Sequence, residues 1–331
     1  MGGRLYDRMP GHPVMAVGLF LMAGVMGLVP LLPQRWILTA AILILGLAEG
    51  SLDVGGNTLL VWVYRDKVGP FMNGLHFFFG VGAFLSPLII ARAMLGSGDI
   101  ARAYWTLALL VLPAAIWLVP LPSPMAPPIS SGGSAGHANP RLVALLVAFF
   151  FLYTGAEIAL GGWIYSYAVA LGLGSPVVAS YLTSVFWGAF TVGRLLSIPL
   201  ATRLPPRSAL LADLVGCLAS LAILTLVSNS LVATFLGTCG VGLSMASIFP
   251  GALSLAQGRL RLTGRVTGWF LVGASAGGMV LPWIIGQFFE SAGPRATMVI
   301  LLIDMVVAMG ILAVLTFRSV RPVYHYITGE H

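Results

Sequence analysis

The chain has 331 residues, of which 58% are hydrophobic and only 8% are charged, and its formal net charge is +7. A soluble globular protein carries about 25% charged residues, so this composition excludes a soluble globular fold. The positive charge does not require a nucleic-acid partner, because its distribution around apolar segments accounts for it.

Long apolar runs follow one another along almost the whole chain. A helix needs about 20 apolar residues to cross the roughly 30 Å hydrocarbon core of a bilayer, and a helix satisfies its own backbone hydrogen bonds there. We therefore predict an all-α, polytopic membrane bundle of ten transmembrane helices. The predicted helices cover residues 13–32, 36–62, 71–95, 101–121, 141–171, 176–202, 207–228, 231–257, 267–289 and 296–317.

One short phrase occurs twice. Gly3-Arg4-Leu5-Tyr6-Asp7 returns as Gly193-Arg194-Leu195-Leu196-Ser197, 190 residues later. A repeat of this kind indicates an architecture of two related halves. Because 52 residues separate Arg141 from Gly193 but only two precede Gly3, the first half is predicted to lack its first two helices. We expect the DNA upstream of Met1 to encode about 50 further residues that form this pair.

Residues 122–140 form a long polar stretch rich in proline, glycine and serine. Such a composition is typical of a linker. The linker divides an N-terminal half, residues 1–121 with four helices, from a C-terminal half, residues 141–331 with six. If the missing pair is restored, the count becomes six plus six.

The basic residues set the orientation in the membrane. If residues 1–12 are cytoplasmic, twelve Lys and Arg residues fall on the inner side and four on the outer side, with Arg194 left inside a helix end. This bias follows the positive-inside rule and predicts a multi-pass protein of the plasma (inner) membrane, with the segments 1–12 and 122–140 cytoplasmic. The outer four are Arg35, Arg92, Arg102 and Arg295.

The repeated phrase resembles a known family signature. Gly3-Arg4-Leu5-Tyr6-Asp7-Arg8, followed by Gly11-His12-Pro13, is similar to the loop between the second and third helices of the major facilitator superfamily, Gly-x-Leu-x-Asp-Arg-x-Gly-Arg-Arg/Lys. It differs by one inserted residue before Gly11 and by His12 in place of a basic residue. The resemblance implies the major facilitator fold of twelve helices minus the first two. It also implies a gating motif of Gly3, Asp7, Arg8, Gly193 and Arg194.

Three segments resemble a narrower branch, that of fucose permease and the sodium-dependent glucose transporter-like proteins. Residues 49–58 look like its fourth helix, residues 75–83 like its fifth, and residues 153–163 like its seventh. The likeness implies transport of a sugar. Where fucose permease carries a polar amide on the fifth helix, this chain has Phe79, which argues against fucose as the solute.

Acidic and amide side chains lie in the second predicted helix. Glu49, Asp53 and Asn57 are spaced four residues apart, so they share one helix face. A carboxylate at membrane depth costs at least ~2.5 kcal/mol and usually marks an ion or substrate path. Asn57 offers both a donor and an acceptor to a sugar hydroxyl. The alternative for Asp53 and Glu49 is a structural carboxyl paired with a neighbouring helix.

Three further side chains complete the predicted substrate and ion site. Glu157 lies deep in its apolar segment, where an acid is functional by default. His76 can titrate near neutrality or serve as a satisfied core histidine. Trp163 can stack on a sugar face or pack between helices.

These features predict a secondary active transporter that moves a small polar solute, a sugar, by proton or sodium symport. Repeated halves, polar midplane residues and a helix interrupted at Phe249-Pro250-Gly251 are its expected parts. The alternatives are a proton-coupled exporter of hydrophobic drugs or metabolites and a non-transporting membrane subunit. No metal-ligand cluster or nucleophilic triad stands out, so we expect no enzyme, no metal and no cofactor besides the coupling ion. The expected partners are the solute and the lipid bilayer around a monomer.

Overall fold

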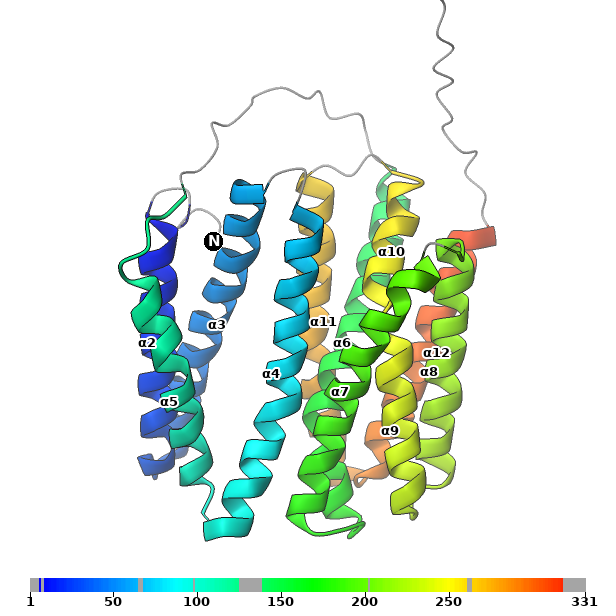
Figure 1. Cartoon of the computed structure of the whole chain (residues 1–331). Helices are drawn as coiled ribbons and strands as arrows, with labels where there is room; N and C mark the ends of the chain where they lie inside the picture. Colours follow the sequence, from blue (N-terminus) through cyan, green and yellow to red (C-terminus); the bar gives the residue numbers. More distant parts are fainter. Residues whose placement is uncertain are drawn as a thin grey trace, which may run out of the picture. The chain divides into compact units, whose positions relative to one another are not determined.

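The computed structural model describes residues 6, 9–64, 68–97, 99–124, 139–201, 203–260 and 264–317, and every regular element within these ranges is helical (Figure 1). The helices are α2 (Gly11–Leu28), η1 (Val29–Leu31), α3 (Arg35–Tyr64), α4 (Val68–Ser97), α5 (Ala101–Leu118), α6 (Pro140–Ala170), α7 (Pro176–Ala201), α8 (Pro206–Leu226), α9 (Leu231–Met245), α10 (Ile248–Gln257), α11 (Gly264–Ser291) and α12 (Arg295–Phe317).

Ten spans in the described part of the chain are long and apolar enough to cross a membrane. They match the ten predicted segments one for one, which confirms the all-α membrane bundle. The chain is therefore an integral, multi-pass membrane protein.

The span Leu231–Gln257 is broken rather than continuous. An interruption was predicted at Phe249-Pro250-Gly251, and the structure places it slightly upstream, where α9 ends at Met245 and α10 begins at Ile248. Proline lacks an N–H and its ring clashes with the carbonyl four residues earlier. For Pro250 that carbonyl belongs to Ala246, so proline weakens the helix at this point. Here the helix breaks at Ala246 and Ser247, whereas α4 and α11 continue through Pro87 and Pro282.

The chain divides into two compact units, Met1–Gly132 and Gly133–His331. The division falls inside the predicted linker 122–140, of which the structure describes residues 122–124 and 139–140. Each unit is described by itself.

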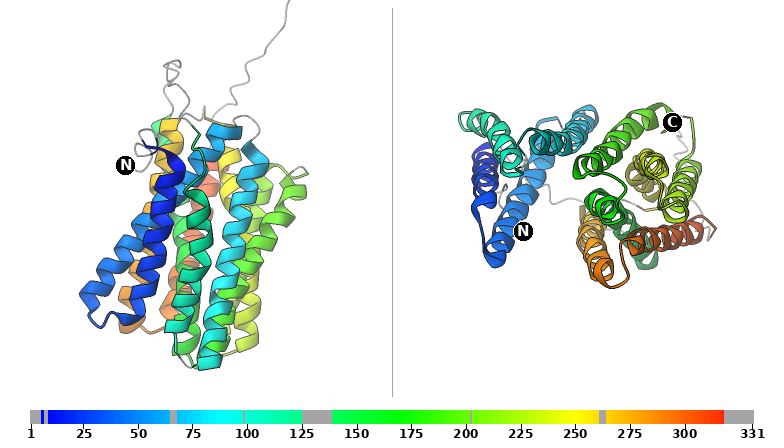
Figure 2. Two further views of the ribbon diagram at one scale, coloured as in Figure 1. Left: turned by 60° about the vertical axis from the view of Figure 1, so that its left-hand side comes forward. Right: turned by 90° about the horizontal axis from the view of Figure 1, so that it is seen from below.

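In the first unit, α2 lies against both α3 and α5, and α4 borders α3 and α5 (Figure 2). His12 ties the start of α2 to the segment after α5. Its backbone N–H donates to Ser123 Oγ at 2.9 Å, and its Nδ1 lies 3.0 Å from the carbonyl oxygen of Pro122. The histidine that departs from the family signature is therefore part of the structure that closes this unit.

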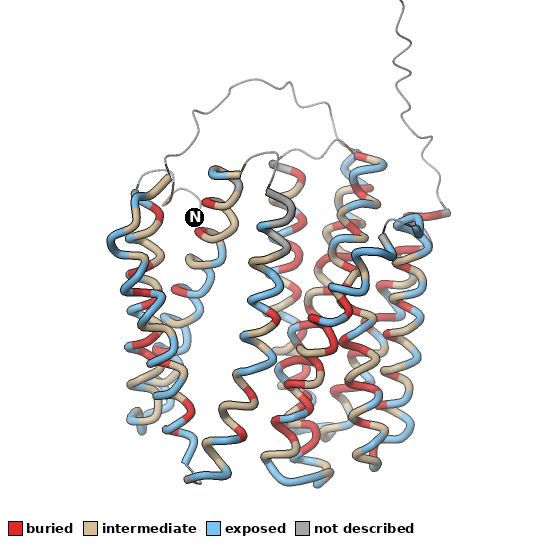
Figure 3. The backbone as a smooth tube through the Cα atoms, viewed as in Figure 1, coloured by how far each residue is buried: buried red, intermediate tan, exposed pale blue. Residues whose placement is uncertain are grey.

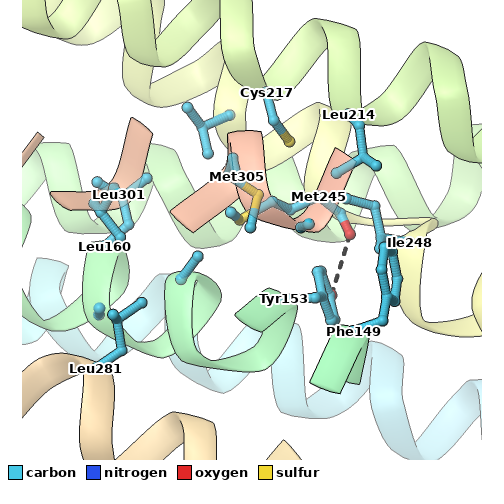
Figure 4. Close-up of a cluster of buried hydrophobic side chains, with 14 of the residues drawn as sticks. Phe149, Tyr153, Leu160, Leu214, Cys217, Met245, Ile248, Leu281, Leu301 and Met305 are labelled. Carbon is cyan, nitrogen blue, oxygen red and sulfur yellow. Dashed lines mark hydrogen bonds between the residues drawn. The ribbon is translucent and has the colours of Figure 1, made fainter. Parts of the chain in front are cut away.

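In the second unit, α6 lies at the centre, against α7, α11 and α12. Figure 3 shows buried positions along much of α6. Of the 18 consecutive residues of α6 that are most apolar, 44% are buried, against 11% for the corresponding stretch of α3. The core around α6 is drawn in Figure 4, with side chains from five further helices. Its labelled members are Phe149, Tyr153, Leu160, Leu214, Cys217, Met245, Ile248, Leu281, Leu301 and Met305.

Corresponding helices of the two units differ in one close contact. A glycine stands five residues before a helix-internal proline in both, as Gly82 and Pro87 of α4 and as Gly277 and Pro282 of α11. A Cβ added at Gly277 would overlap the carbonyl oxygen of Phe151 on α6, whereas no described atom lies within 4 Å of a Cβ at Gly82. The face of α4 at Gly82 is therefore open where α11 receives α6.

Candidate functional site

The polar face of α3 brings Asp53 and Asn57 into contact. The Asn57 side-chain nitrogen donates to the Asp53 carboxylate oxygen Oδ1 at 2.9 Å and to the Asp53 carbonyl oxygen at 2.9 Å. Asp53 is exposed and Asn57 is half-buried. The predicted shared face is confirmed by this hydrogen bond, while the role of the two residues in binding stays a prediction.

Glu49 lies one turn before Asp53 and is exposed. It makes no hydrogen bond or ion pair with a described residue. Glu49, Asp53 and Asn57 stand near the middle of the 30-residue α3, at the depth where a charge is most costly in a bilayer. The three side chains thus present two acids and an amide along one open face.

Tyr6 packs against α3 and forms a hydrogen bond with it. Its hydroxyl donates to the carbonyl oxygen of Ser51 at 2.7 Å, and the side chain is only 2% exposed. The ring end lies so close to Gly55 that a Cβ there would overlap it. Tyr6 belongs to the repeated signature, but sequence reasoning missed it as a site-supporting residue, because an aromatic at a variable motif position carries no signal of its partner. The predicted gating residues Gly3, Asp7 and Arg8 lie outside the described residues.

His76 stands on α4 and is exposed. Its neighbour Leu75 lies against Gly56 of α3, 3.7 Å from the position of a Cβ there. The two helices therefore meet one residue away from both His76 and Asn57. The next three residues, Phe77, Phe78 and Phe79, are also exposed, by 36%, 71% and 51%.

In the second unit, Glu157 is 9% exposed within α6. One turn earlier Tyr153 is fully buried, and its hydroxyl donates to the Met245 carbonyl oxygen at 3.1 Å. Arg194 on α7 stacks over the Phe190 ring, 4.5 Å from its centroid. A buried acid and a buried phenol thus lie one turn apart on α6.

Gly193, the other predicted gating residue in the second unit, is buried at the break between α9 and α10. A Cβ added there would lie 2.7 Å from both the Leu243 carbonyl oxygen and the Ala246 side chain. The second copy of the repeated phrase therefore packs α7 directly onto the interrupted helix. Its gating role remains a prediction.

Trp163 connects α6 with α11. Its indole N–H donates to the Pro282 carbonyl oxygen at 3.1 Å, and its ring lies 4.9 Å from the ring of Phe289. Gly286 leaves room for the indole. The half-buried Trp163 thus has a packing role, and stacking on a solute stays a prediction.

Two acids that the sequence analysis left out of the site are structurally distinctive. Asp213 on α8 accepts a hydrogen bond of 2.5 Å from Ser247, at the break before α10. Asp304 on α12 is 6% exposed, and its Oδ2 has no hydrogen-bond partner among the described residues. The sequence indicated the helix break at which Ser247 lies, but it did not identify Asp213 as the partner of Ser247.

Comparison with known proteins identifies the family and its relatives. The family model described as Major Facilitator Superfamily matches residues 1–282. Sodium-dependent glucose transporter 1 of Xenopus laevis is 30% identical over 316 residues, covering 86% of this chain and 64% of the relative. The Danio rerio protein of the same name is 32% identical over 326 residues, covering 86% of this chain and 55% of the relative. The chain thus spans about 64% and 55% of these relatives.

Solved structures share the fold. The E. coli fucose:proton symporter, FucP, superposes with a TM-score of 0.61 at 17% identity, covering 95% of this chain and 86% of that chain. A bacterial homologue of the human lysosomal transporter Spinster, in an inward-facing and occupied conformation, has a TM-score of 0.65 at 12% identity and covers 91% and 81%. At these identities the likeness concerns the fold alone.

Proposed function

The chain belongs to the major facilitator superfamily, and on that premise we propose that it is a secondary active transporter that moves a sugar together with a proton or a sodium ion. The observation that carries the proposal is the Asp53–Asn57 pair on the open face of α3, with Glu49 one turn away. The protein works as a monomer in the plasma membrane and needs no cofactor besides the coupling ion.

The chemistry of the pair suits both partners of a symport. Asp53 and Glu49 supply carboxylates that bind a proton or a hard cation through oxygen. The side-chain nitrogen of Asn57 donates to one carboxylate oxygen of Asp53, and the side-chain oxygen of Asn57 can accept a hydrogen bond from a sugar hydroxyl. Solute and ion then meet on the same side chains, so the binding of one changes the affinity for the other, which is the requirement for coupling.

The names of similar proteins support a sugar as the solute. The Xenopus relative is named a sodium-dependent glucose transporter, and the structurally similar FucP is described as a fucose:proton symporter. One name indicates sodium and the other a proton as the coupling ion. Transport measurements with each ion gradient therefore identify the ion.

Uptake into proteoliposomes tests the function. The purified full chain is reconstituted, and labelled glucose is offered with an imposed sodium gradient, an imposed proton gradient, or neither. We expect accumulation under one of the two gradients, and its abolition by an ionophore for that ion. Uptake of glucose, fucose and other hexoses that stays at the level of empty vesicles under both imposed gradients would overturn the sugar proposal.

A hydrophobic solute is the second candidate, because Phe77, Phe78 and Phe79 form an exposed aromatic run on α4. An exporter of hydrophobic compounds would extrude a fluorescent lipophilic cation when a proton gradient is imposed. The same vesicles therefore separate the two functions: hexose accumulation supports the first, and cation extrusion without hexose uptake supports the second.

A further inference from the structure

A groove runs between α4 and α5 in the first unit, at the end of the helices where the two are joined. Its volume is about 470 Å³. Leu85, Leu88 and Ile89 form its apolar wall, and Arg92 and Arg102 provide its cations. None of these residues belongs to the polar face of α3.

The two arginines lie at the same level. Arg92 stands four residues before the end of the span Gly74–Gly96, and Arg102 is the second residue of the span Ala101–Leu118. Both are exposed, and neither forms an ion pair with a described residue. Arginines at helix ends extend to the headgroup region of a bilayer, so two guanidinium groups flank the groove where lipid phosphates lie.

The apolar wall continues inward from the arginines. Leu88 lies one turn and Leu85 about two turns deeper than Arg92, which corresponds to about 10 Å along α4 at 1.5 Å per residue. The groove thus has a cationic mouth at headgroup level and a hydrocarbon floor below it. This order of polarity matches one phospholipid with its phosphate outward.

The corresponding helix of the second unit, α11, does not have this combination of leucines and arginine. When Gly82 and Pro87 are aligned with Gly277 and Pro282, the positions of Leu85, Leu88 and Arg92 fall on Val280, Trp283 and Gln287. Val280 and Trp283 are 37% and 63% exposed, so this face is not the one that receives α6. This helix face is exposed in both units, but it carries an arginine, Arg92, only in the first; the second has Gln287 at that position. The fold therefore does not require an arginine there.

We propose that the groove between α4 and α5 binds one anionic phospholipid, with the phosphate held between Arg92 and Arg102 and an acyl chain along Leu85, Leu88 and Ile89. Planar guanidinium groups suit phosphate oxygens because they donate two hydrogen bonds in one plane. The site is separate from the proposed solute site, and its test does not depend on transport.

Native mass spectrometry of the full chain in a non-ionic detergent measures the binding. Dioleoyl phosphatidylglycerol is titrated against dioleoyl phosphatidylcholine, which has the same chains and no net charge. We expect phosphatidylglycerol to bind more tightly. Arg92→Gln and Arg102→Gln should each weaken its binding about fivefold, and the double variant about 25-fold, as expected for roughly 1 kcal/mol per cation near anionic lipid.

Arg35→Gln is the matched control, because Arg35 is an exposed arginine of the same unit that does not line the groove. It should leave both affinities unchanged. Arg92→Lys keeps the charge but loses the planar pair of donors, so it should bind phosphatidylglycerol more weakly than the unmutated protein and more tightly than Arg92→Gln. Arg102→Glu, near the start of α5, supplies an independent variant if Arg92→Gln does not fold, and it should abolish the preference for phosphatidylglycerol.

Three results would overturn the proposal. The first is an unchanged phosphatidylglycerol affinity in the double variant. The second is an equal loss in Arg35→Gln, which would indicate attraction to net charge only. The third is competition by glycerol phosphate at the same concentration as the lipid, which would indicate an anion site that makes no use of the acyl chain.

Discussion

The side-chain amide of Asn57 donates a hydrogen bond of 2.9 Å to the carboxylate of Asp53, one turn earlier on α3. The bond occupies one oxygen of an acid at mid-span and leaves the other for a proton, a cation or a solute hydroxyl. Coupling between solute and ion is therefore expected to depend on the charge of Asp53.

Asp53→Asn removes that charge and keeps the shape. We expect exchange of labelled sugar between the two sides of a proteoliposome membrane to persist, and accumulation against a gradient to fall to the level of empty vesicles, because the amide cannot bind and release the coupling ion. Glu290→Gln, at an exposed acid near the end of α11, is the control and should transport normally. Accumulation at the unmutated level in Asp53→Asn would make Asp53 a structural acid and transfer the coupling role to Glu157.

Tyr6 supports the same helix through a hydrogen bond and through packing, and two substitutions separate these effects. Tyr6→Phe removes only the bond to the Ser51 carbonyl and should lower the free energy of unfolding by about 1 kcal/mol. Tyr6→Ala also leaves a cavity beside Gly55 and should cost about 3–5 kcal/mol. Unfolding in mixed detergent, followed by circular dichroism, measures both. Equal stabilities of Tyr6→Ala and the unmutated protein would show that the segment before α2 does not brace α3.

Gly82 and Gly277 offer a matched pair in one chain. Gly277→Ala should destabilise the protein by about 3 kcal/mol or more, since overpacking at a backbone contact forces helices apart, here α6 from α11. Gly82→Ala should be tolerated, because no described atom lies near the added methyl group. The same unfolding assay compares them. A larger loss in Gly82→Ala than in Gly277→Ala would contradict the packing described for α4 and α11.

The Asp213–Ser247 hydrogen bond joins α8 to the break before α10. Ser247→Ala should lower the free energy of unfolding by about 1–3 kcal/mol, because it leaves a partly buried carboxyl without its donor. Asp213→Asn and the double variant complete a thermodynamic cycle, whose interaction energy we expect to exceed about 0.5 kcal/mol for residues in contact. Additive losses would show that the 2.5 Å contact contributes no stability of its own.

The class of fold and the number of spans follow from the amino-acid sequence alone. Hydrophobic length decides whether a segment crosses a bilayer, and this property is local, so ten segments could be placed without any tertiary information. The proximity of Asp53 and Asn57 was equally predictable, because helical periodicity puts residues four apart on the same face. The break near Pro250 was foreseen for the same local reason and was misplaced by only a few residues.

The contacts between side chains that are distant in the sequence depend on the tertiary structure. Tyr6 donates a hydrogen bond to Ser51, Trp163 donates one to the carbonyl oxygen of Pro282, and Asp213 accepts one from Ser247. In the first two contacts the acceptor is a backbone oxygen, which the type of residue does not predict. Gly82 and Gly277 occupy the same place in the same pattern, yet one lies open and the other touches α6. Their difference comes from the neighbouring helix, which a periodicity along one helix does not encode.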